Sequence, residues 1–408
     1  MKVCVIGCVH GEIDDLYSAV RETEEKMGAK VDVVLCCGDF QAVRNLADLQ
    51  TMACPDKYKS MNTFYKYYSG ECRAPVLTIF IGGNHEASNH LQELPYGGWV
   101  AENIYYLGIA GCVKLTPSVT VCGLSGIYDK RDLHKGRFEL VPYDRNSERS
   151  IYHTRQFDAN RLFLLPSSKP VNFFLSHDWP VNVVPKGTSR TEQLLRKKPF
   201  FRQDVDKGEL GSPVLRDLLC KIRPQYWFSA HLHVKFATEV VEEHDSNPDD
   251  LALEEEEEPR TTKFLALDKI VKGRDFLQIL DLPEVTEPIE LQYDLDWLAI
   301  VKATHDRQPT QQWSESKTAA GLDLGAAQAF VRSRFGDAPV PVPRNFAQTV
   351  QAYDPAEEAQ SEERRLKTSG NPQLDAFYDL LDLSHLLPFT VPFAAPPPAV
   401  PSASENLE

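Results

Sequence analysis

The chain has 408 residues, of which 42% are hydrophobic and 25% charged, and it carries a formal net charge of −15. A chain of this length and apolar content can bury one large core and a smaller second one. No stretch approaches the roughly 20 apolar residues of a membrane-spanning helix, and Met1–Gly7 lacks the apolar region and cleavage site of a signal peptide. We therefore expect neither a membrane anchor nor N-terminal targeting.

The negative charge is concentrated in one segment. Ten acidic residues and no Lys or Arg lie between Glu242 and Glu258, which leaves a net charge of −5 on the rest of the chain. Such a block is typical of a solvated, mobile loop, and a regulatory role as a phosphate mimic is the alternative. The overall negative charge therefore does not exclude a nucleic-acid substrate.

The nine cysteines are odd in number, and several lie within apolar, strand-like runs. Because no secretory signal precedes them, they predict reduced thiols in the cytosol or nucleus rather than a disulfide framework.

Short runs of β-branched and aromatic residues alternate with helix-like segments in the first part of the chain. Strands are predicted at Lys2–Gly7, Val31–Cys36, Val76–Ile81, Ile104–Leu107, Val119–Leu124, Val171–Leu175, Tyr226–Ser229, Thr262–Leu267 and Phe276–Leu280. Two amphipathic stretches, Ile13–Met27 and Ala42–Ala53, separate the first three strands and are predicted to be helical. This alternation indicates an α/β domain. Several later strands are joined only by turns, so we expect mixed rather than purely parallel sheets.

The pattern weakens after about Asp281. Tyr293–Leu298 is expected to be ordered and to pack back on the core, and Ala319–Arg334 is predicted to be helical. Pro339–Arg344 is rich in proline. From about Pro388 the proline content is too high for a helix or an inner strand, and it predicts disorder.

Five short clusters of metal-ligating side chains each follow a predicted strand. They are Cys8-Val9-His10, Gly38-Asp39, Gly82-Gly83-Asn84-His85-Glu86, Ser176-His177-Asp178 and Ala230-His231-Leu232-His233. Loops beyond the carboxyl ends of strands meet at one edge of an α/β sheet. Imidazole favours Zn, Fe or Mn, and a carboxylate can bridge two ions about 3.5–4 Å apart, the arrangement used for phosphoester displacement. A lone His is more often structural, but five clusters in this order predict one shared two-metal site.

The order of these clusters resembles the calcineurin-like metallophosphoesterases, in which D-x-H, G-D, G-N-H-[DE], H and G-H-x-H follow one another. Cys8 stands where that family usually has Asp, and Ala230 where it usually has Gly. The Cys is itself typical of the RNA lariat debranching enzymes. Long stretches are similar to that subfamily, namely Leu35–Asn45, Phe80–His90, Pro95–Val100, Leu175–Pro180 and Tyr226–Phe236. The resemblance is dense from Met1 to about Leu280 and continues weakly to Pro355.

The resemblance implies an α/β fold, a four-layer α-β-β-α sandwich with two mixed β-sheets and the metals at one edge, plus a smaller C-terminal extension. Residues 1–241 would form the catalytic domain and 242–260 an acidic flexible loop. Residues 261–385 would supply returning strands and a C-terminal debranching-enzyme-like region, and 386–408 a disordered Pro-rich tail.

The same resemblance implies two divalent metal ions, Fe²⁺/Zn²⁺ or Mn²⁺. The ligands implied for one ion are His10, Asp39 and His233, with Cys8 nearby, and those implied for the other are Asp39, Asn84, His177 and His231. Asp39 would bridge the two. Cys8 leaves two alternatives open: a thiolate would be a soft ligand favouring Zn or Fe, whereas a neutral thiol would only crowd the site.

His85 is not among the implied ligands. The resemblance gives it the role of a general acid that protonates the departing ribose oxygen, or of a phosphate contact. An imidazole suits acid catalysis because it exchanges a proton near neutrality. The implied reaction is hydrolysis of the 2′,5′-phosphodiester at the branch point of excised intron lariat RNA, which yields a linear RNA.

Basic and aromatic side chains interleave between Leu124 and Arg161, a segment that we name the basic–aromatic loop. The substrate-binding residues expected there are Tyr128, Lys130, Arg131, Lys135, Arg137, Tyr143, Arg145, Arg149, Tyr152 and Arg155. Basic side chains bind phosphates and aromatic rings stack on unpaired bases, and the subfamily carries its lariat-recognition loop here. A solvated loop of mixed charge is the alternative, because six acidic residues are also present.

The implied partner is branched (lariat) RNA, with no membrane, no evident obligate protein partner, and the nucleus as the expected compartment, with shuttling to the cytoplasm left open. Three other functions remain. A protein phosphatase would share the metal site but leave the basic–aromatic loop without a purpose. A DNA or RNA repair nuclease differs only in substrate, and a non-catalytic scaffold is suggested by Cys8 but disfavoured by the other ligands and His85.

Overall fold

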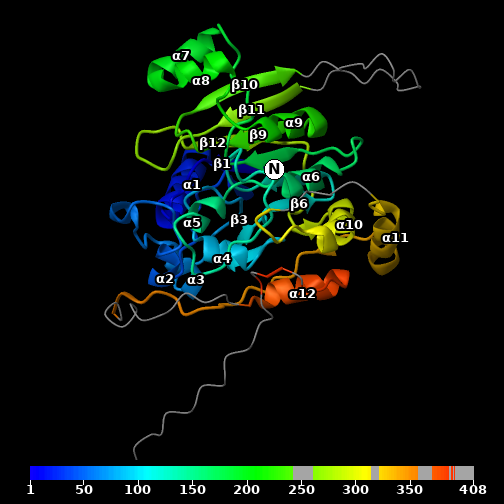
Figure 1. Cartoon of the computed structure of the whole chain (residues 1–408). Helices are drawn as coiled ribbons and strands as arrows, with labels where there is room; N and C mark the ends of the chain where they lie inside the picture. The colour runs from blue at the N-terminus through cyan, green and yellow to red at the C-terminus, as the bar shows by residue number, and fades with distance from the viewer. Residues whose placement is uncertain (242–260, 314–320, 357–369, 386, 389, 391–408) are drawn as a thin grey trace, which may run out of the picture.

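The computed structural model describes residues 1–241, 261–313, 321–356, 370–385, 387–388 and 390. The acidic block expected to be a flexible loop lies outside the described residues, as does most of the Pro-rich tail. Two mixed β-sheets form the centre of the molecule, and helices cover the outer face of each (Figure 1).

The first sheet has six strands. Their order is β12 (Leu277–Asp281), β1 (Lys2–Ile6), β2 (Val33–Cys36), β3 (Leu77–Phe80), β5 (Ile104–Tyr106) and β4 (Gly98–Ala101). The inner strands β1, β2, β3 and β5 run parallel, and the edge strands β12 and β4 are antiparallel to their neighbours. The carboxyl ends of β1, β2 and β3 therefore open at the same edge.

The second sheet has eight strands. Their order is β10 (Phe236–Val241), β11 (Thr261–Ala266), β9 (Tyr226–Ser229), β8 (Phe173–Ser176), β7 (Val119–Leu124), β6 (Ala110–Thr116), β13 (Gln292–Tyr293) and β14 (Val340–Pro341). Strands β11, β9, β8 and β7 are parallel, and the remaining pairs are antiparallel. The mixed character expected from the turn-linked later strands is confirmed.

The alternation of side chains along β1 explains why four layers form. Val3 and Val5 point into the core between the two sheets, whereas Cys4 and Ile6 point to the outer face, because successive strand residues face opposite sides. In β8, Phe173 lies in the core between the sheets and Phe174 in the outer core of the second sheet. Strands β1 and β8 are thus apolar and buried on both faces, which confirms the four-layer sandwich.

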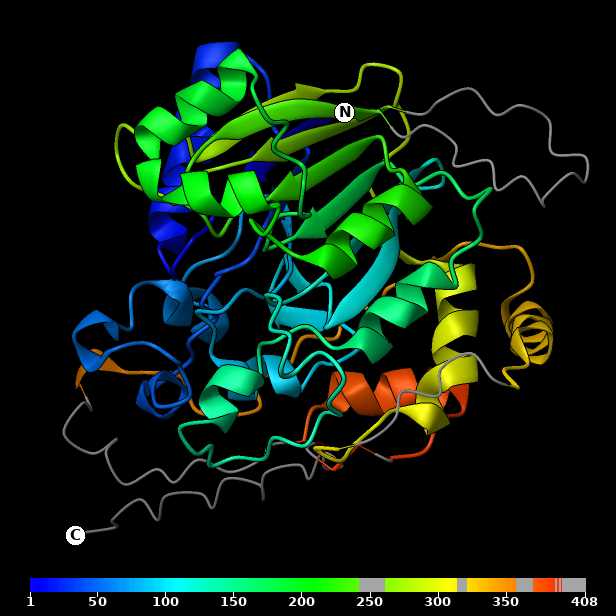
Figure 2. The same cartoon turned by 45° about the horizontal axis from the view of Figure 1, so that its top comes forward.

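The helices are divided between the two outer faces. Those packed on the first sheet are α1 (Ile13–Met27) and α3 (Phe64–Ser69). Those packed on the second sheet are α6 (Gln156–Phe163), α7 (Ser189–Lys197), α8 (Arg202–Lys207), α9 (Pro213–Ile222), α10 (Leu295–Thr304), α11 (Leu324–Phe335) and α12 (Pro372–Leu381). Figure 2 shows α10 in yellow beside α12 in orange-red. Short helices α2 (Leu46–Leu49), α4 (Ser88–Gln92) and α5 (Ser147–Ser150) lie in the connections.

Helix α1 has the predicted bounds, but the helix predicted at Ala42–Ala53 is wrong. Only Leu46–Leu49 is helical there, because local side chains take the backbone donors. The Asp48 N–H donates to the Asn45 side chain, which caps the start of the helix, and the Arg44 N–H donates to the Asp48 side chain, so the chain before Leu46 is not helical. The apolar periodicity did not reveal these polar contacts.

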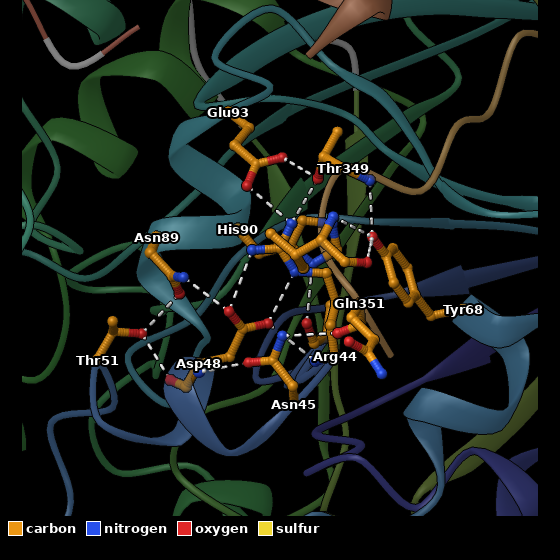
Figure 3. A network of polar contacts seen from close by, with 12 residues as sticks. Arg44, Asn45, Asp48, Thr51, Tyr68, Asn89, His90, Glu93, Thr349 and Gln351 are labelled. Atoms are coloured by element: carbon orange, nitrogen blue, oxygen red, sulfur yellow. Dashed lines mark hydrogen bonds and ion pairs between the residues drawn. The ribbon is translucent and has the colours of Figure 1, made fainter. Parts of the chain in front are cut away.

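The buried guanidinium of Arg44 joins this region to the C-terminal part of the chain. Arg44 donates to the carboxylates of Asp48 at 2.8 Å and Glu93 at 2.7 Å, and to the Thr349 hydroxyl at 2.8 Å (Figure 3). Asn45 donates to the Gln351 carbonyl at 2.9 Å. The segment around Thr349 is therefore fixed against the chain that follows Asp39.

The segment expected to pack back on the core does so, since α10 buries Trp297 and Leu298. All nine cysteines lie in the described part of the chain and are free. No helix among the described residues has the length and apolarity needed to cross a membrane.

Candidate metal centre and active site

The five predicted clusters follow five parallel strands of the two sheets. Cys8 and His10 follow β1, Asp39 follows β2 and Asn84 follows β3. His177 and the pair His231 and His233 follow β8 and β9 of the other sheet. Both sheets open at the same edge, and the structure brings the metal-ligand candidates together there.

The backbone of these loops is held in a conformation that L-residues seldom adopt. The φ angles of His10, Asp39, His231 and His233 are 52°, 47°, 60° and 49°. Non-glycine residues in this region cost free energy and persist only where the surroundings fix them. The N–H groups of Val9 and His10 both donate to the Asp39 carbonyl, at 3.1 and 2.6 Å, so two of the loops hold each other.

The first predicted ligand set forms a compact cluster. One ligand atom from each of Cys8, His10, Asp39 and His233 lies within 4.8 Å of the others. Nε2 of His10 lies 3.4 Å from Nε2 of His233 and 3.8 Å from Oδ2 of Asp39. Two ring nitrogens thus face each other next to one carboxylate.

The electrostatics of this cluster suit a cation. Burial lowers the pKa of His10 to about 4, although Asp39 opposes the shift. Burial and then the neighbouring His10 lower the pKa of His233 to about 3. Both imidazoles are therefore neutral at physiological pH and direct lone pairs to one point, the arrangement required of imidazole metal ligands.

Cys8 is wholly buried in the same cluster. Burial, reinforced by the Asp39 carboxylate, raises the pKa of the Cys8 thiol well above its usual range. A bound divalent cation would act in the opposite direction, because coordination deprotonates a thiol. Ligation and crowding therefore both remain predictions for this residue.

The second predicted ligand set surrounds His177. Its Nε2 lies 3.2 Å from both Oδ1 of Asp39 and Oδ1 of Asn84, and its ring centroid lies 5.0 Å from that of His231. Nδ1 of His177 lies 2.7 Å from the Cys37 carbonyl, which fixes Nδ1 as the donor and leaves Nε2 for the site.

Asp39 lies between the two ligand sets. Burial acts to raise the pKa of Asp39, but the His177 and His10 imidazoles outweigh it and hold that pKa well below its usual range. Burial acts to lower the pKa of His177, and the Asp39 carboxylate reverses this and raises it. One carboxylate oxygen faces each side, Oδ2 toward His10 and Oδ1 toward His177. This donor set fits two divalent cations bridged by Asp39.

Two glycines of the predicted clusters leave the space that the contacts around Asp39 and His177 require. A Cβ on Gly83 would lie 2.3 Å from Oδ1 of Asp39 and 2.8 Å from Nε2 of His177. A Cβ on Gly38, whose φ is +96°, would lie 2.5 Å from Nδ1 of His177. Ala230, where the wider family usually has Gly, is accommodated with its N–H donating to the His177 carbonyl at 3.1 Å.

Glu86 is a site residue whose role the sequence did not reveal. Its buried carboxylate accepts from the N–H groups of Phe40, Gln41 and Gly83, at 2.9, 2.7 and 2.9 Å. Burial and the nearby Asp39 charge raise the pKa of Glu86 to about 7 despite these donors. The contacts tie the loop after β2 to the loop after β3. The available signal was an acidic residue in the same motif as Asn84 and His85.

His85 lies at the rim of the site. Its N–H donates to Oδ1 of Asp39 at 2.8 Å, and its half-buried ring lies 5.5 Å from the His10 ring, centroid to centroid. The side chain is therefore close to the first ligand set and still partly accessible from solvent. This position is compatible with the predicted contact with phosphate or with a leaving group.

The basic–aromatic loop is anchored to the metal centre. Gly82 N–H donates to the Ser125 hydroxyl, and Gly126 N–H donates to the Gly82 carbonyl, each at 2.9 Å. Tyr152 lines a small cavity together with Gly83 and Glu86. The loop thus begins and returns beside the predicted ligands.

The ten predicted substrate contacts fall into three groups. Four are exposed: Lys130, Arg131, Arg145 and Arg149. Four are half-buried: Tyr128, Lys135, Tyr143 and Tyr152. Lys135 pairs with Asp132 at 2.6 Å, and the Tyr143 hydroxyl donates to Gln92 at 2.6 Å.

The remaining two, Arg137 and Arg155, are buried inside the loop. Arg137 donates to the carboxylate of Asp158 at 2.9 Å, and Arg155 pairs with the carboxylate of Glu139. Because both guanidinium groups are enclosed with their own carboxylates, they hold the loop together and do not face a substrate. We therefore replace the sequence-based assignment of these two residues to RNA binding with a structural role.

Comparison with known proteins agrees with this geometry. Residues 1–235 match the family described as calcineurin-like phosphoesterase, and residues 259–386 match the one described as lariat debranching enzyme, C-terminal domain. The chain is therefore a calcineurin-like phosphoesterase, a class defined by the sandwich and the metal-ligand loops found here.

Relatives with high sequence identity identify the family within this class. The lariat debranching enzyme of Arabidopsis thaliana is 44% identical over 95% of this chain and 87% of its own length. Lariat debranching enzyme A of Xenopus laevis is 48% identical over 87% of this chain, and the Homo sapiens enzyme 47% identical over 87%. This chain belongs to the lariat debranching enzyme family. It spans just under two thirds of the vertebrate relatives, 65% of the Xenopus and 64% of the human protein.

Proposed function

We propose that this protein hydrolyses the 2′,5′-phosphodiester at the branch point of excised intron lariat RNA and releases a linear RNA. The observation that carries the proposal is the placement of Asp39 between two imidazole groups, with His85 at the rim. The similar proteins from Xenopus laevis and Arabidopsis thaliana are named lariat debranching enzymes, which supports the choice of substrate.

The residues that would hold the metals are those of the two ligand sets. His10, His233 and Asp39 would bind one ion, and Asp39, Asn84, His177 and His231 the other. We propose Fe²⁺ with Zn²⁺, or Mn²⁺, because each set contains two imidazoles together with the shared Asp39 carboxylate. Two such cations lower the pKa of water and offset the charge that develops on phosphate.

The protein's own side chains orient His85 and allow it to supply a proton to the leaving group. Asp39 fixes the backbone of His85 through the N–H at 2.8 Å, so the imidazole is presented at the partly open rim. From there it can give a proton to the ribose oxygen as the phosphorus–oxygen bond breaks. Glu86 keeps the loops of Asp39 and Asn84 at a constant separation through its three backbone contacts.

The test compares two bonds within one molecule. Purified protein, supplied with Mn²⁺ or with Fe²⁺ and Zn²⁺, is incubated with a branched RNA that carries both 2′,5′ and 3′,5′ linkages at one adenosine. We expect cleavage of the 2′,5′ linkage only. Cleavage of both linkages would indicate a general nuclease, and hydrolysis of phosphoprotein or generic esters alone would indicate a phosphatase.

A further inference from the structure

We propose that Trp313, in the C-terminal region, extends the RNA-binding surface by stacking on an unpaired base in one arm of the branched RNA. The identity of the RNA rests on the proposed function. The indole of Trp313 is 77% exposed, more than any other large hydrophobic side chain in the described part of the chain. A large exposed aromatic ring beside basic side chains is typical of single-strand binding surfaces.

The segment that carries Trp313 is fixed against the basic–aromatic loop. It follows α10, and the N–H groups of Gly136 and Arg137 donate to the carbonyls of Gln311 at 3.0 Å and Pro309 at 2.8 Å. A Cβ on Gly136 would lie 2.5 Å from the Gln311 carbonyl oxygen, so only glycine permits this approach. Residues far apart in the sequence therefore form one surface.

A groove beside Trp313 shares Tyr152 with the cavity next to the metal site. Nζ of Lys135 lies 5.3 Å from the centroid of the Trp313 ring, and Lys135 lines the groove together with Phe138, Arg149, Tyr152 and the neighbouring Gln312. Tyr152 also lines the cavity beside Gly83 of the metal site. An RNA arm leaving the branch point could follow this path past Tyr152 and Lys135 to the indole.

Each acidic side chain of the groove already has hydrogen-bond or ion-pair partners within the loop. Asp129 pairs with Arg131 at 2.6 Å, and Asp132 contacts both Lys135 and His153. Asp144 accepts from the backbone of the short helix α5 that it precedes.

The guanidinium of Arg149 is the basic group that this groove leaves available. It is exposed, and within the described residues it takes part in no hydrogen bond or ion pair. Its positive charge can contact a phosphate of the RNA backbone.

The experiment measures binding separately from chemistry. We expect Trp313→Ala to weaken binding of a linear single-stranded RNA, and to raise KM for a long-armed branched RNA, by roughly fivefold to hundredfold. The kcat value, and KM for a minimal branched RNA with one nucleotide beyond each bond, should stay unchanged. Trp313→Phe should retain most of the affinity.

Phe200→Ala is the matched control. Phe200 is also an exposed aromatic, at 69%, with Lys198 5.8 Å from its ring centroid, but it lies between α7 and α8 on a different part of the molecule (Figure 1). This variant should bind both RNAs as the wild type does.

Three results would overturn the inference or separate it from the proposed function. Unchanged RNA affinity in Trp313→Ala would overturn it and leave the indole to a protein contact. Equal losses on both branched substrates, with a lower Tm, would show a structural role and also overturn it. If the wild type cleaves no 2′,5′ bond but binds single-stranded RNA through Trp313, the proposed function fails and this inference stands.

Discussion

The metal centre and the basic–aromatic loop contain the same kinds of polar residue but use them differently. In the metal centre, His10, Asp39 and His177 converge on one point, with the Asp39 carboxylate between the two imidazoles. In the loop, Arg137 and Arg155 turn inward and neutralise carboxylates of the loop itself. A charged residue of the metal centre is thus a candidate for a catalytic or metal-binding role. A charged residue of the loop is a candidate for RNA binding only if its side chain faces solvent.

The difference has a physical cause. A long connection with little regular structure must satisfy its own backbone and side chains if it is to be ordered. Arg155 does this by donating to the Ser150 carbonyl at 3.0 Å as well as to Glu139. The number of basic residues in the loop therefore overstates its capacity to bind RNA. Four of the predicted basic contacts are exposed, namely Lys130, Arg131, Arg145 and Arg149.

The largest effect is expected from Asp39→Asn, which keeps the shape of the side chain and removes its charge. Turnover should be lost and the metal content should fall, because a neutral amide cannot balance two cations. Metal analysis after gel filtration and cleavage of branched RNA measure the two effects. Normal metal content and turnover in this variant would contradict the two-metal site.

The next largest effect is expected from His85→Ala. It should keep both metals and bind branched RNA, yet lose about 10²–10⁴-fold in kcat, the usual range for a general acid. Single-turnover cleavage with metal analysis of the same sample measures this. Loss of metal would instead show that His85 belongs to the ligand set.

Local patterns in the sequence predicted the strands, the mixed sheets and the metal-ligand clusters, and the resemblance to a known family added the four-layer sandwich. Strand alternation and motif order can be seen residue by residue, as in Val3-Cys4-Val5 and Asn84-His85. The role of Glu86 and the inward turn of Arg155 depend on contacts between distant segments, which no local pattern specifies. The failed helix prediction at Ala42–Ala53 has a different origin, because the side chains of Asn45 and Asp48 within that stretch accept hydrogen bonds from its own backbone.

Arg155→Leu should affect stability rather than substrate binding. It leaves the Glu139 carboxylate buried without its partner, so we expect the free energy of unfolding to fall by about 3–5 kcal/mol. Chemical denaturation measures the change. The control Arg145→Leu, at an exposed position of the same loop, should shift stability by less than about 0.5 kcal/mol. Similar stability of the two variants would contradict the proposed structural role of Arg155.

The smallest effect, and the one that tests the loop most directly, is expected from Arg145→Gln combined with Arg149→Gln. Both side chains are exposed, so their removal should leave stability and metal content unchanged. Affinity for branched RNA should fall, and the slope of log affinity against log salt should decrease by about 0.7 for each phosphate that the variant no longer binds. Hydrolysis of bis-p-nitrophenyl phosphate should not change, because that small ester needs only the metal centre. If RNA affinity and its salt dependence both match the wild type, the exposed cations of the loop do not bind RNA, and the loop serves the fold alone.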